Sequence, residues 1–528
     1  MKASDLLVSS LEREDVEYVF GVPGEETEDL LFSLRDSDIR FIPVRHEQGA
    51  AFMANVYGRL TGEAGVSLGT LGPGATNLVT GVADANLDKA PLVAITGQGG
   101  LERLHKESHQ ALDIVQMFEP ITKWNTQLND PDIITESVRK AFKIAEYEKP
   151  GATHLEFPEN VARSETDSTP MDPRERVQHA APEPSLIQRV QEYLNAADRP
   201  LIIAGNGAVR TGAATRLREF VEKTGIPVAS TYMGKGAVSD RSSQSLLTLD
   251  SGDHQEASDA IEMADLILTV GYDIAEHDPA GWNKGTDTVI VHLDSEPAEV
   301  YEAYNPNLEL VCNLSTALAK LTEEMDDSDT QFDETWYHDL RDHILEDIAA
   351  NPPEDGGFTV RSVLPVLRAV MDAEDVLISD VGSHKMQIAQ NFPTYEPNTC
   401  IISNGLASMG ISVPGGVAAD LATDAEVVAA TGDGGFLMNG AEIETATRVG
   451  CSYTILLFVD DDYGLISEKQ RAHRGESFGT ELTNPDFMTL AESFGIDGYR
   501  PEKWDELEET LRDALNTDGM SLVEIPVE

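Results

Sequence analysis

Two apolar runs near the C-terminus are each followed by an aspartate. Val427-Val428-Ala429-Ala430 precedes Gly432-Asp433-Gly434-Gly435, and Thr454-Ile455-Leu456-Leu457-Phe458-Val459 precedes Asp460. A strand, a glycine-rich turn, a helix and a second strand form a unit of a parallel sheet, and ligands bind outside the carboxyl ends of such strands. A Gly-Asp-Gly sequence alone is often a simple turn, but the second aspartate and the helix N-terminus favour a site for Mg²⁺ and a diphosphate.

The chain has 528 residues, which is enough for about three domains. Apolar runs alternate with amphipathic stretches, and this pattern favours α/β architecture over a β-sandwich. We expect three α/β domains, each a doubly wound parallel sheet, at residues 1–160, 186–321 and 358–528. Residues 161–185 are predicted to be a linker, and residues 322–357 a polar stretch with helical pattern and much acid.

The chain is strongly acidic. It has 38 Lys and Arg residues against 93 Asp and Glu residues, and its formal net charge is −55 at pH 7. Such a surface repels nucleic acid and anionic membranes, so we expect neither as a partner. The acidic residues are spread over all segments, which argues against a disordered tail. We interpret the charge as adaptation to a high-salt cytosol, where screening makes self-repulsion tolerable.

Cysteine use and hydropathy indicate a cytoplasmic protein. Cys312, Cys400 and Cys451 have neither the pairing of a disulfide framework nor the spacing of a metal site, so we expect reduced residues near cores. The N-terminus has no charged segment followed by an apolar one, and no run of about 18 apolar residues occurs. We therefore expect neither a secretion signal nor a membrane span.

Two other motifs leave alternatives open. Gly205-Asn206-Gly207, with Gly212 late, is a poor match to the dinucleotide-binding fingerprint, and a tight strand-to-helix turn is the preferred interpretation. Glu47 follows the strand-like run Phe41-Ile42-Pro43-Val44 and opens a helix of small residues. A carboxylate there is either a helix cap or a catalytic acid. The diphosphate site predicted in the same chain favours the acid.

Three motifs together resemble the thiamine-diphosphate-dependent enzymes of the acetolactate synthase family: Arg45-His46-Glu47-Gln48-Gly49-Ala50-Ala51, Gly72-Pro73-Gly74-Ala75-Thr76-Asn77 and the pair Asp433 and Asp460. The resemblance covers essentially the whole chain. It implies an N-terminal pyrimidine-binding domain, a central domain and a C-terminal diphosphate-binding domain. It also implies a homodimer or homotetramer, because in this family the cofactor lies between complementary domains of two subunits. A regulatory small subunit is not expected.

The resemblance implies a role for each matched residue. Glu47 resembles the acid that bonds N1′ of the cofactor's pyrimidine, so that the 4′-nitrogen can remove the C2 proton. Met409 matches the residue that holds the cofactor bent, with an ordinary core methionine as the alternative. The implied Mg²⁺ ligands are Asp433, Asp460 and the backbone carbonyl of Asp462. The other implied cofactor contacts are Pro23, Gly24, Asn77, Gly382, Ser383, His384, Ala407, Gly434, Gly435, Tyr463, Gly464 and Leu465, with His384 alternatively a structural histidine.

Other segments resemble the catabolic, flavin-independent branch of the family. They are Ser108-His109-Gln110-Ala111-Leu112-Asp113 and the central run from Val270 to Asn283. Lys469 stands where the biosynthetic branch tends to have Trp. The resemblance therefore implies no FAD, and pyruvate as both donor and acceptor. His109 and Gln110 would hold the pyruvate carboxylate and carbonyl, with a turn cap as the alternative role of His109.

The predicted function is acetolactate synthase: decarboxylation of pyruvate and ligation of the hydroxyethyl group to a second pyruvate. Two positions depart from the catabolic pattern, namely Glu26 in place of Lys and Ala407 in place of Gln. A carboxylate at position 26 would repel an anionic acceptor if it pointed inward. These departures leave open a related decarboxylase or carboligase for another 2-oxo acid. A non-catalytic paralogue in mixed oligomers is a further alternative, opposed by the presence of every residue that the chemistry needs.

The predicted adaptation to salt can be tested by titration. We expect the purified protein to lose its folded circular dichroism spectrum as the salt concentration falls well below about 1 M, because the screening length then grows and the acidic groups repel one another. Full stability in dilute buffer would contradict the interpretation.

Overall fold

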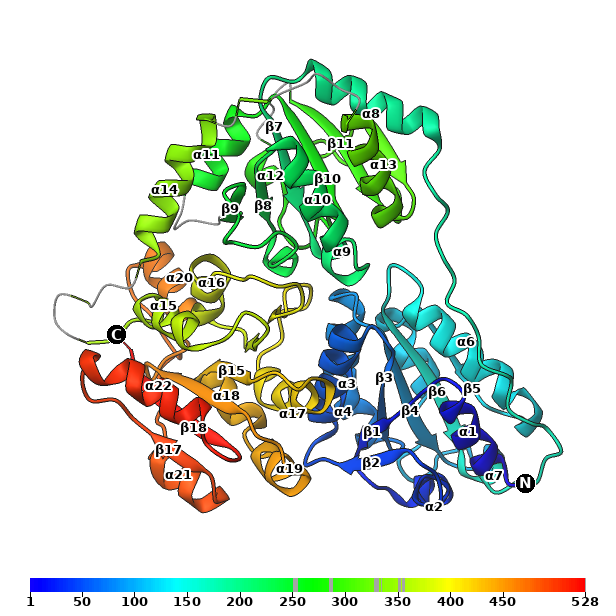
Figure 1. Cartoon of the computed structure of the whole chain (residues 1–528). Helices are drawn as coiled ribbons and strands as arrows, with labels where there is room; N and C mark the ends of the chain where they lie inside the picture. Colours follow the sequence, from blue (N-terminus) through cyan, green and yellow to red (C-terminus); the bar gives the residue numbers. More distant parts are fainter. Residues whose placement is uncertain are drawn as a thin grey trace.

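The computed structural model describes residues 1–249, 255–283, 288–326, 332–333, 335–349, 353 and 357–527. They form three α/β domains, each built on a six-stranded sheet whose strands pair in parallel (Figure 1). The predicted fold class is thereby confirmed. Strands of such sheets are covered by helices on both faces and must be apolar along their length, as the fully buried strand β7 (Pro200–Ala204) illustrates.

The N-terminal sheet has the strand order β2-β1-β3-β4-β6-β5. The strands are β1 (Tyr18–Gly21), β2 (Arg40–Pro43), β3 (Gly65–Gly69), β4 (Leu92–Gln98), β5 (Trp124–Gln127) and β6 (Ala152–Pro158), and the helices are α1 (Ala3–Glu12), α2 (Glu28–Arg35), α3 (Glu47–Thr61), α4 (Pro73–Leu87), α5 (Ile114–Phe118), α6 (Ile134–Glu146) and α7 (Glu159–Ala162).

The C-terminal sheet repeats this order as β14-β13-β15-β16-β18-β17. Its elements are α15 (Val360–Val370), β13 (Val376–Ser379), α16 (Ser383–Asn391), β14 (Cys400–Ile402), α17 (Ser412–Ala422), β15 (Val427–Gly432), α18 (Asp433–Asn439), α19 (Glu442–Val449), β16 (Thr454–Val459), α20 (Gly464–Arg474), α21 (Phe487–Phe494), β17 (Asp497–Tyr499), α22 (Leu507–Leu515) and β18 (Ser521–Pro526). The two outer domains therefore share one topology.

The central sheet has the order β12-β11-β10-β7-β8-β9. Its remaining elements are α8 (Pro184–Ala196), α9 (Asn206–Arg210), α10 (Ala214–Thr224), β8 (Val228–Ser230), β9 (Ser245–Thr248), α11 (Gln255–Met263), β10 (Leu266–Val270), α12 (Pro279–Trp282), β11 (Val289–Asp294), β12 (Leu308–Val311), α13 (Leu314–Asp326) and α14 (His338–Asp347). An extended segment between α7 and α8 runs along one side of the molecule to reach this domain (Figure 1).

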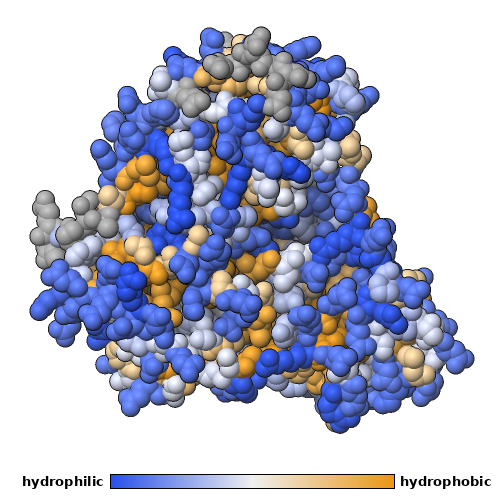
Figure 2. All heavy atoms as spheres, viewed as in Figure 1, coloured by the Kyte–Doolittle hydropathy of each residue, from blue (hydrophilic) through white to orange (hydrophobic). Residues whose placement is uncertain are grey.

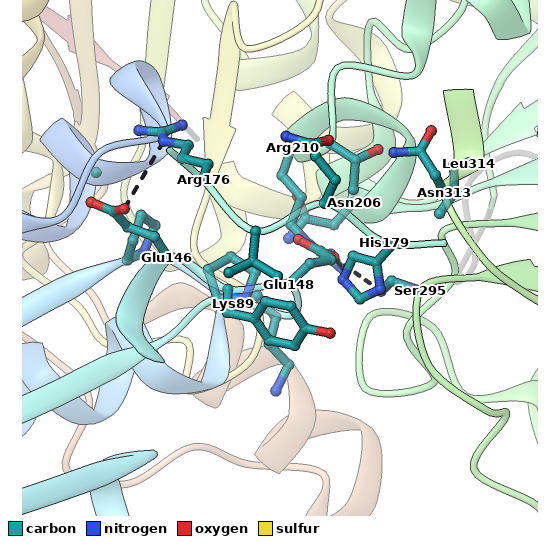
Figure 3. Close-up of a pocket in the computed structure, with 18 of the residues that line it drawn as sticks. Lys89, Glu146, Glu148, Arg176, His179, Asn206, Arg210, Ser295, Asn313 and Leu314 are labelled. Atoms are coloured by element: carbon teal, nitrogen blue, oxygen red, sulfur yellow. Dashed lines mark hydrogen bonds and ion pairs between the residues drawn. The ribbon is translucent and has the colours of Figure 1, made fainter. Parts of the chain in front are cut away.

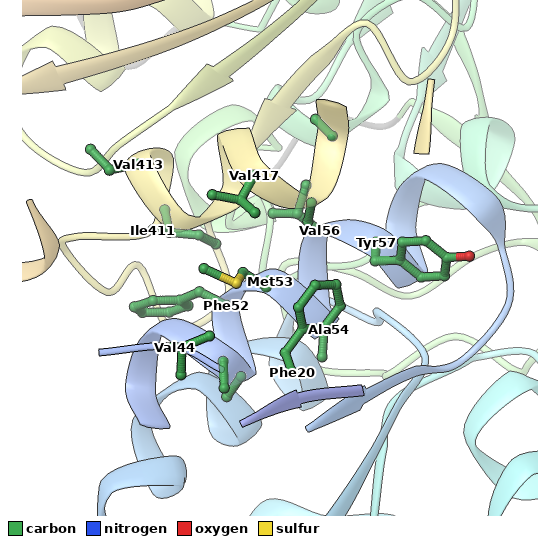
Figure 4. Close-up of a cluster of buried hydrophobic side chains, with 14 of the residues drawn as sticks. Phe20, Val44, Phe52, Met53, Ala54, Val56, Tyr57, Ile411, Val413 and Val417 are labelled. Atoms are coloured by element: carbon green, nitrogen blue, oxygen red, sulfur yellow. The ribbon is translucent and has the colours of Figure 1, made fainter. Parts of the chain in front are cut away.

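The two outer domains share a hydrophobic core. Helix α3 packs against α17, and Phe52, Met53 and Val56 of α3 lie in one buried cluster with Val413 and Val417 of α17 (Figure 4). Burying a side chain of this size contributes about 1.5–3 kcal/mol. The N- and C-terminal domains of one chain are therefore held together by apolar contact rather than by the linker alone.

Two buried acids at the C-terminal end of α4, Asp84 and the C-cap residue Asp88, reinforce this interface. Asp88 accepts hydrogen bonds from the backbone N–H groups of Asn404 and Gly405, at 3.2 and 2.5 Å. Asp84 accepts one from Ser403 Oγ at 2.8 Å. Arg59 lies 3.5 Å from Asp88, and burial, followed by the charge of Asp88, raises the pKa of Asp84 well above its usual value. The segment that follows β14 is thus fixed by the N-terminal domain.

Hydrophilic side chains cover most of the face shown in Figure 2, as the composition predicts. Cys312, Cys400 and Cys451 are buried and free, as predicted. In the part of the chain that the structure describes, every helix is too short or too polar to cross a membrane.

Candidate active site

A cavity of about 250 Å³ lies at the carboxyl ends of β13, β15 and β16. The chain leaves β13 and β15 toward opposite sides of the sheet, which makes this the topological switch point where α/β folds bind ligands. The structure brings together here all of the predicted site residues of the C-terminal domain: Gly382, Ser383, His384, Ala407, Met409, Asp433, Gly434, Gly435, Asp460, Asp462, Tyr463, Gly464 and Leu465.

Asp433 and Asp460 place two carboxylates at one end of the cavity. Asp433 is buried and accepts hydrogen bonds from the backbone N–H groups of Gly434 and Asp461, at 2.8 and 2.9 Å. Burial raises its pKa. Partial burial, followed by the charge of Asp433, raises the pKa of Asp460 to about 6. Two carboxylates that repel each other in this way fit a divalent cation.

Protein side chains alone do not complete a metal site. Among the described residues, no group of three or more His, Cys, Asp or Glu side chains could hold an ion. The Asp462 side chain lies 3.5 Å from Arg471. The donor set therefore fits a hard cation such as Mg²⁺, which keeps several waters and binds phosphate oxygens alongside one or two carboxylates.

His384 and the glycines shape the rest of the cavity. His384 is buried, and burial lowers its pKa to about 4, so its imidazole is neutral. Its Nε2 atom has no hydrogen-bond partner within the described parts of the chain. A Cβ atom at Gly464 would lie 2.8 Å from Asp460 Oδ2, and one at Gly434 would lie 2.8 Å from the Tyr463 ring. An unpaired buried nitrogen beside glycine backbone fits an anionic group such as a diphosphate.

Sequence analysis missed Asp380, which follows β13 directly and is fully buried. It accepts hydrogen bonds from Val381 N–H at 2.7 Å, Gly410 N–H at 2.8 Å and Ser412 Oγ at 3.0 Å. Gly435 also packs on its carboxylate. Asp380 therefore ties together the three cavity segments that follow β13, β14 and β15. Its place at a strand end, like those of Asp433 and Asp460, was the available signal.

The predicted residues of the N-terminal domain lie at the carboxyl edge of their own sheet. Glu47 is the first residue of α3 and is 8 % exposed. Its Oε2 atom accepts a hydrogen bond from Asn77 Nδ2 at 2.9 Å. His46 caps the helix by accepting the N–H of Gln48, which leaves the Glu47 carboxylate available for another role. Pro23 and Gly24 follow β1 at the same edge.

His109 and Gln110 lie on an exposed segment between β4 and α5. Gln110 has φ = 55°, a left-handed conformation that costs free energy in a residue with a side chain. Its backbone packs on Gly72, where a Cβ atom would lie 2.8 Å from the Gln110 carbonyl oxygen. None of Glu47, His109 and Gln110 lines the C-terminal cavity. One chain therefore presents its predicted residues on two separate sheet edges.

Comparison with known proteins shows the family of the chain. Family models of thiamine pyrophosphate enzymes match three parts of the chain: the N-terminal TPP binding domain at residues 1–117, the central domain at 187–321 and the C-terminal TPP binding domain at 380–525. The chain is 33% identical to an acetolactate synthase of Bacillus subtilis over 534 residues, covering 100% of this chain and 93% of that protein. The chain belongs to the acetolactate synthase family of thiamine pyrophosphate enzymes.

Other relatives carry the same name. A catabolic acetolactate synthase of Raoultella terrigena is 33% identical, and the match covers 99% of this chain and 95% of that protein. A probable acetolactate synthase large subunit of Methanococcus aeolicus is 31% identical, with 100% and 92% covered. The family predicted from the motifs at Glu47, Asn77 and Asp433 is thus confirmed.

A second cavity, of about 210 Å³, lies between the N-terminal domain, the linker and the central domain (Figure 3). It lies near the turn from β7 to α9, in which Gly205 and Gly207 pack on the Gly271 backbone. The preferred interpretation of this motif, a tight turn, is confirmed. Arg210 beside the cavity pairs with Glu148 and Asp273, at 2.7 and 3.0 Å.

We expect Asp380→Ala to weaken thiamine diphosphate binding at least about tenfold, because the cavity segments that follow β13 and β14 would lose hydrogen bonds worth about 0.5–1.5 kcal/mol each. Titration calorimetry in the presence of Mg²⁺ measures this. The matched control is Asp375→Ala. Asp375 is also buried and accepts backbone N–H groups of Asp372 and Glu426, but it precedes β13 at the opposite sheet edge. Equal losses of affinity in both variants would contradict the assigned role of Asp380.

Proposed function

We propose that this member of the family is an acetolactate synthase. It decarboxylates pyruvate and joins the hydroxyethyl group to a second pyruvate, giving 2-acetolactate and CO₂ with thiamine diphosphate and Mg²⁺. The observation that carries the proposal is the full-length similarity to relatives named acetolactate synthase. The two sheet edges supply residues of the required chemistry.

The residues of the C-terminal cavity would bind and orient the cofactor. Asp433 and Asp460, with the backbone carbonyl of Asp462, would hold Mg²⁺, and His384 Nε2 and the Gly382-Ser383 backbone would contact the diphosphate. The half-buried Met409 would fix the cofactor by packing from the cavity wall. When bound, thiamine diphosphate supplies a carbon nucleophile and an electron sink for decarboxylation.

The N-terminal edge would handle protons and substrate. The carboxylate of Glu47, held by Asn77 Nδ2, would exchange a proton with the pyrimidine ring of the cofactor. His109 and Gln110 would bind the carboxylate and the carbonyl of pyruvate from their exposed segment. The residues around the site would also have to exclude water, because access of protons would divert the product from acetolactate to acetaldehyde.

We propose a homodimer or homotetramer in the cytoplasm, with each active site between two subunits. Glu47 does not line the cavity of its own chain, and the N-terminus of α3 instead contacts Glu442, which accepts the N–H groups of Arg45 and His46. Four apolar side chains that are 39–49% exposed would be covered by a partner: Ile466, which lines the cavity, and Leu406, Leu437 and Met438, which lie close to lining residues in the chain. A regulatory small subunit is not part of the proposal.

We propose that the enzyme works without FAD. At the carboxyl ends of β10 and β11, Asp273 and Asp294 pair with Lys149 at 2.5 and 2.9 Å. Burial opposes ionisation of Asp273, but Arg210 and Lys149 together lower its pKa to about 2, so it is charged. Lys149 and Arg210 are therefore already paired with carboxylates, and the phosphates of a dinucleotide would have to compete with Asp273 and Asp294 for them.

A decarboxylase or carboligase for another 2-oxo acid is the competing proposal, and Ala407 favours it. Ala407 lines the cavity with a small side chain in a left-handed conformation, at φ = 56°. The small side chain leaves room for a larger substrate than pyruvate. Glu26, the other departure, accepts hydrogen bonds from Thr70 Oγ1 at 3.1 Å and Arg103 Nη2 at 3.3 Å, so its charge is compensated.

The deciding experiment is pyruvate turnover in high salt with thiamine diphosphate and Mg²⁺ and without flavin, with acetolactate and acetaldehyde assayed separately. We expect acetolactate as the main product. Acetaldehyde alone would identify a decarboxylase. No consumption of pyruvate by the cofactor-loaded protein would favour another 2-oxo acid.

Glu47→Gln is expected to lower turnover by about 10²–10⁴-fold, because an amide cannot exchange the proton. Cofactor affinity, measured by calorimetry, should change by less than about tenfold, because the cavity residues are intact. Glu508→Gln is the control, since Glu508 pairs with Arg512 at 2.9 Å on the exposed surface of α22. Unchanged turnover in Glu47→Gln would remove the central assignment.

Mixing two inactive variants tests the shared site. In a dimer of one Glu47→Gln chain and one Asp433→Ala chain, one site carries both changes and the other carries neither. Random mixing should therefore restore about a quarter of wild-type turnover. A site built within one chain would give none.

A further inference from the structure

The segment that carries His109 and Gln110 has little secondary structure of its own. It begins after β4, passes through a short 3₁₀ helix, η2 (Leu101–Arg103), and reaches α5 at Ile114. Most of its side chains are exposed. A segment of this kind holds a precise geometry only where other parts of the fold fix it.

Arg103 supplies such a fixed point. Its Nη1 atom donates to Ser108 Oγ at 3.2 Å and to the carbonyl oxygen of His109 at 3.4 Å. Its Nη2 atom donates to Glu26 Oε1 at 3.3 Å and to Glu159 Oε1 at 3.1 Å. One guanidinium thus connects the segment to residues that follow β1 and β6.

The two carboxylates are themselves anchored. Glu26 accepts a hydrogen bond from Thr70 Oγ1 at 3.1 Å, and Glu159 accepts one from the N–H of Gly100 at 3.2 Å. The side chains of Arg103, Glu26 and Glu159 are 23%, 9% and 20% exposed. At this depth a carboxylate without its cation is costly, because neither water nor salt screens it fully.

Gly99 makes room for this arrangement. A Cβ atom at Gly99 would lie 2.6 Å from Arg103 Nε and 2.7 Å from its Cζ. The guanidinium therefore lies directly against the backbone, and any other residue at position 99 would displace it. The glycine at position 99 and the two ion pairs therefore fix the Arg103 side chain in the same position.

We propose that Arg103 is a positioning residue for the reaction proposed above: it fixes the segment of His109 and Gln110 and cancels the charge of Glu26 beside the acceptor pyruvate. The inference rests on the proposed function. Without Arg103 the segment would loosen and Glu26 would face the substrate carboxylate as an uncompensated anion. Ligation should suffer more than decarboxylation, because the acceptor is the second anion to bind.

The test compares Arg103→Met, Arg103→Lys, Glu26→Gln and the double variant Glu26→Gln/Arg103→Met. Arg163→Met is the matched control, since Arg163 also pairs with Glu159, at 3.2 Å, but lies at the surface. We expect Arg103→Met to raise the KM for pyruvate about tenfold and to increase the acetaldehyde share, with kcat for pyruvate consumption changed less. Arg103→Lys keeps the positive charge, so its rise in KM and in acetaldehyde share should be smaller than that of Arg103→Met. In the double variant both quantities should return toward the wild-type values.

A second readout is independent of the substrate. Lys106 is exposed within the segment, and a lysine-specific endoprotease should cut after it at least about tenfold faster in Arg103→Met than in Arg163→Met. The inference would be overturned if Arg103→Met and Arg163→Met were cleaved at equal rates. It would also be overturned if the wild type were active and Arg103→Met had the same KM for pyruvate and the same product ratio. If the wild type did not consume pyruvate, the proposed function would fail while the cleavage rates still decided the role of Arg103.

Discussion

The packing of α3 and α4 on the C-terminal domain is the contact on which the rest of the arrangement depends. Apolar side chains of α3 and α17 form one core. The buried carboxylates of Asp84 and Asp88 accept hydrogen bonds from the Ser403 hydroxyl and from the backbone N–H groups of residues 404 and 405. That backbone leads directly to Ala407 and Met409 at the cavity. Burial raises the pKa of both acids, and their hydrogen bonds add to the apolar contact that holds the two domains together.

Much of the fold and of the C-terminal site follows from local sequence. Continuous apolar runs define buried parallel strands, and a polar residue directly after such a run must lie at the carboxyl edge. Asp433 and Asp460 were found in this way, and their meeting at one cavity follows from the adjacent pairing of β15 and β16. Asp380 obeys the same rule, but without a glycine-rich turn it lacked a second signal.

Other features depend on pairs that are distant in the chain. Glu26 and Arg103 are separated by 77 residues, and no periodicity in the sequence indicates that they meet. The expectation that the Glu26 carboxylate would repel an anionic substrate did not include its pairing with Arg103. The acidic stretch after residue 322 was predicted to carry helical pattern, but its charge gave no sign of where a helix would pack. Helix α14 lies in this stretch, and its Ile344 is buried in the central domain.

Helix α4 has a consequence for an assembly with sites between chains. Its first turns carry Asn77, which holds Glu47. Asp84 near its C-terminal end and Asp88 directly after it hold the segment of Met409. In such an assembly Glu47 and Met409 of one chain belong to different active sites. A single helix would then support two active sites at once. A substitution that tilts this helix in one subunit would therefore impair both active sites of a dimer, including the one to which the unchanged partner contributes its own residues.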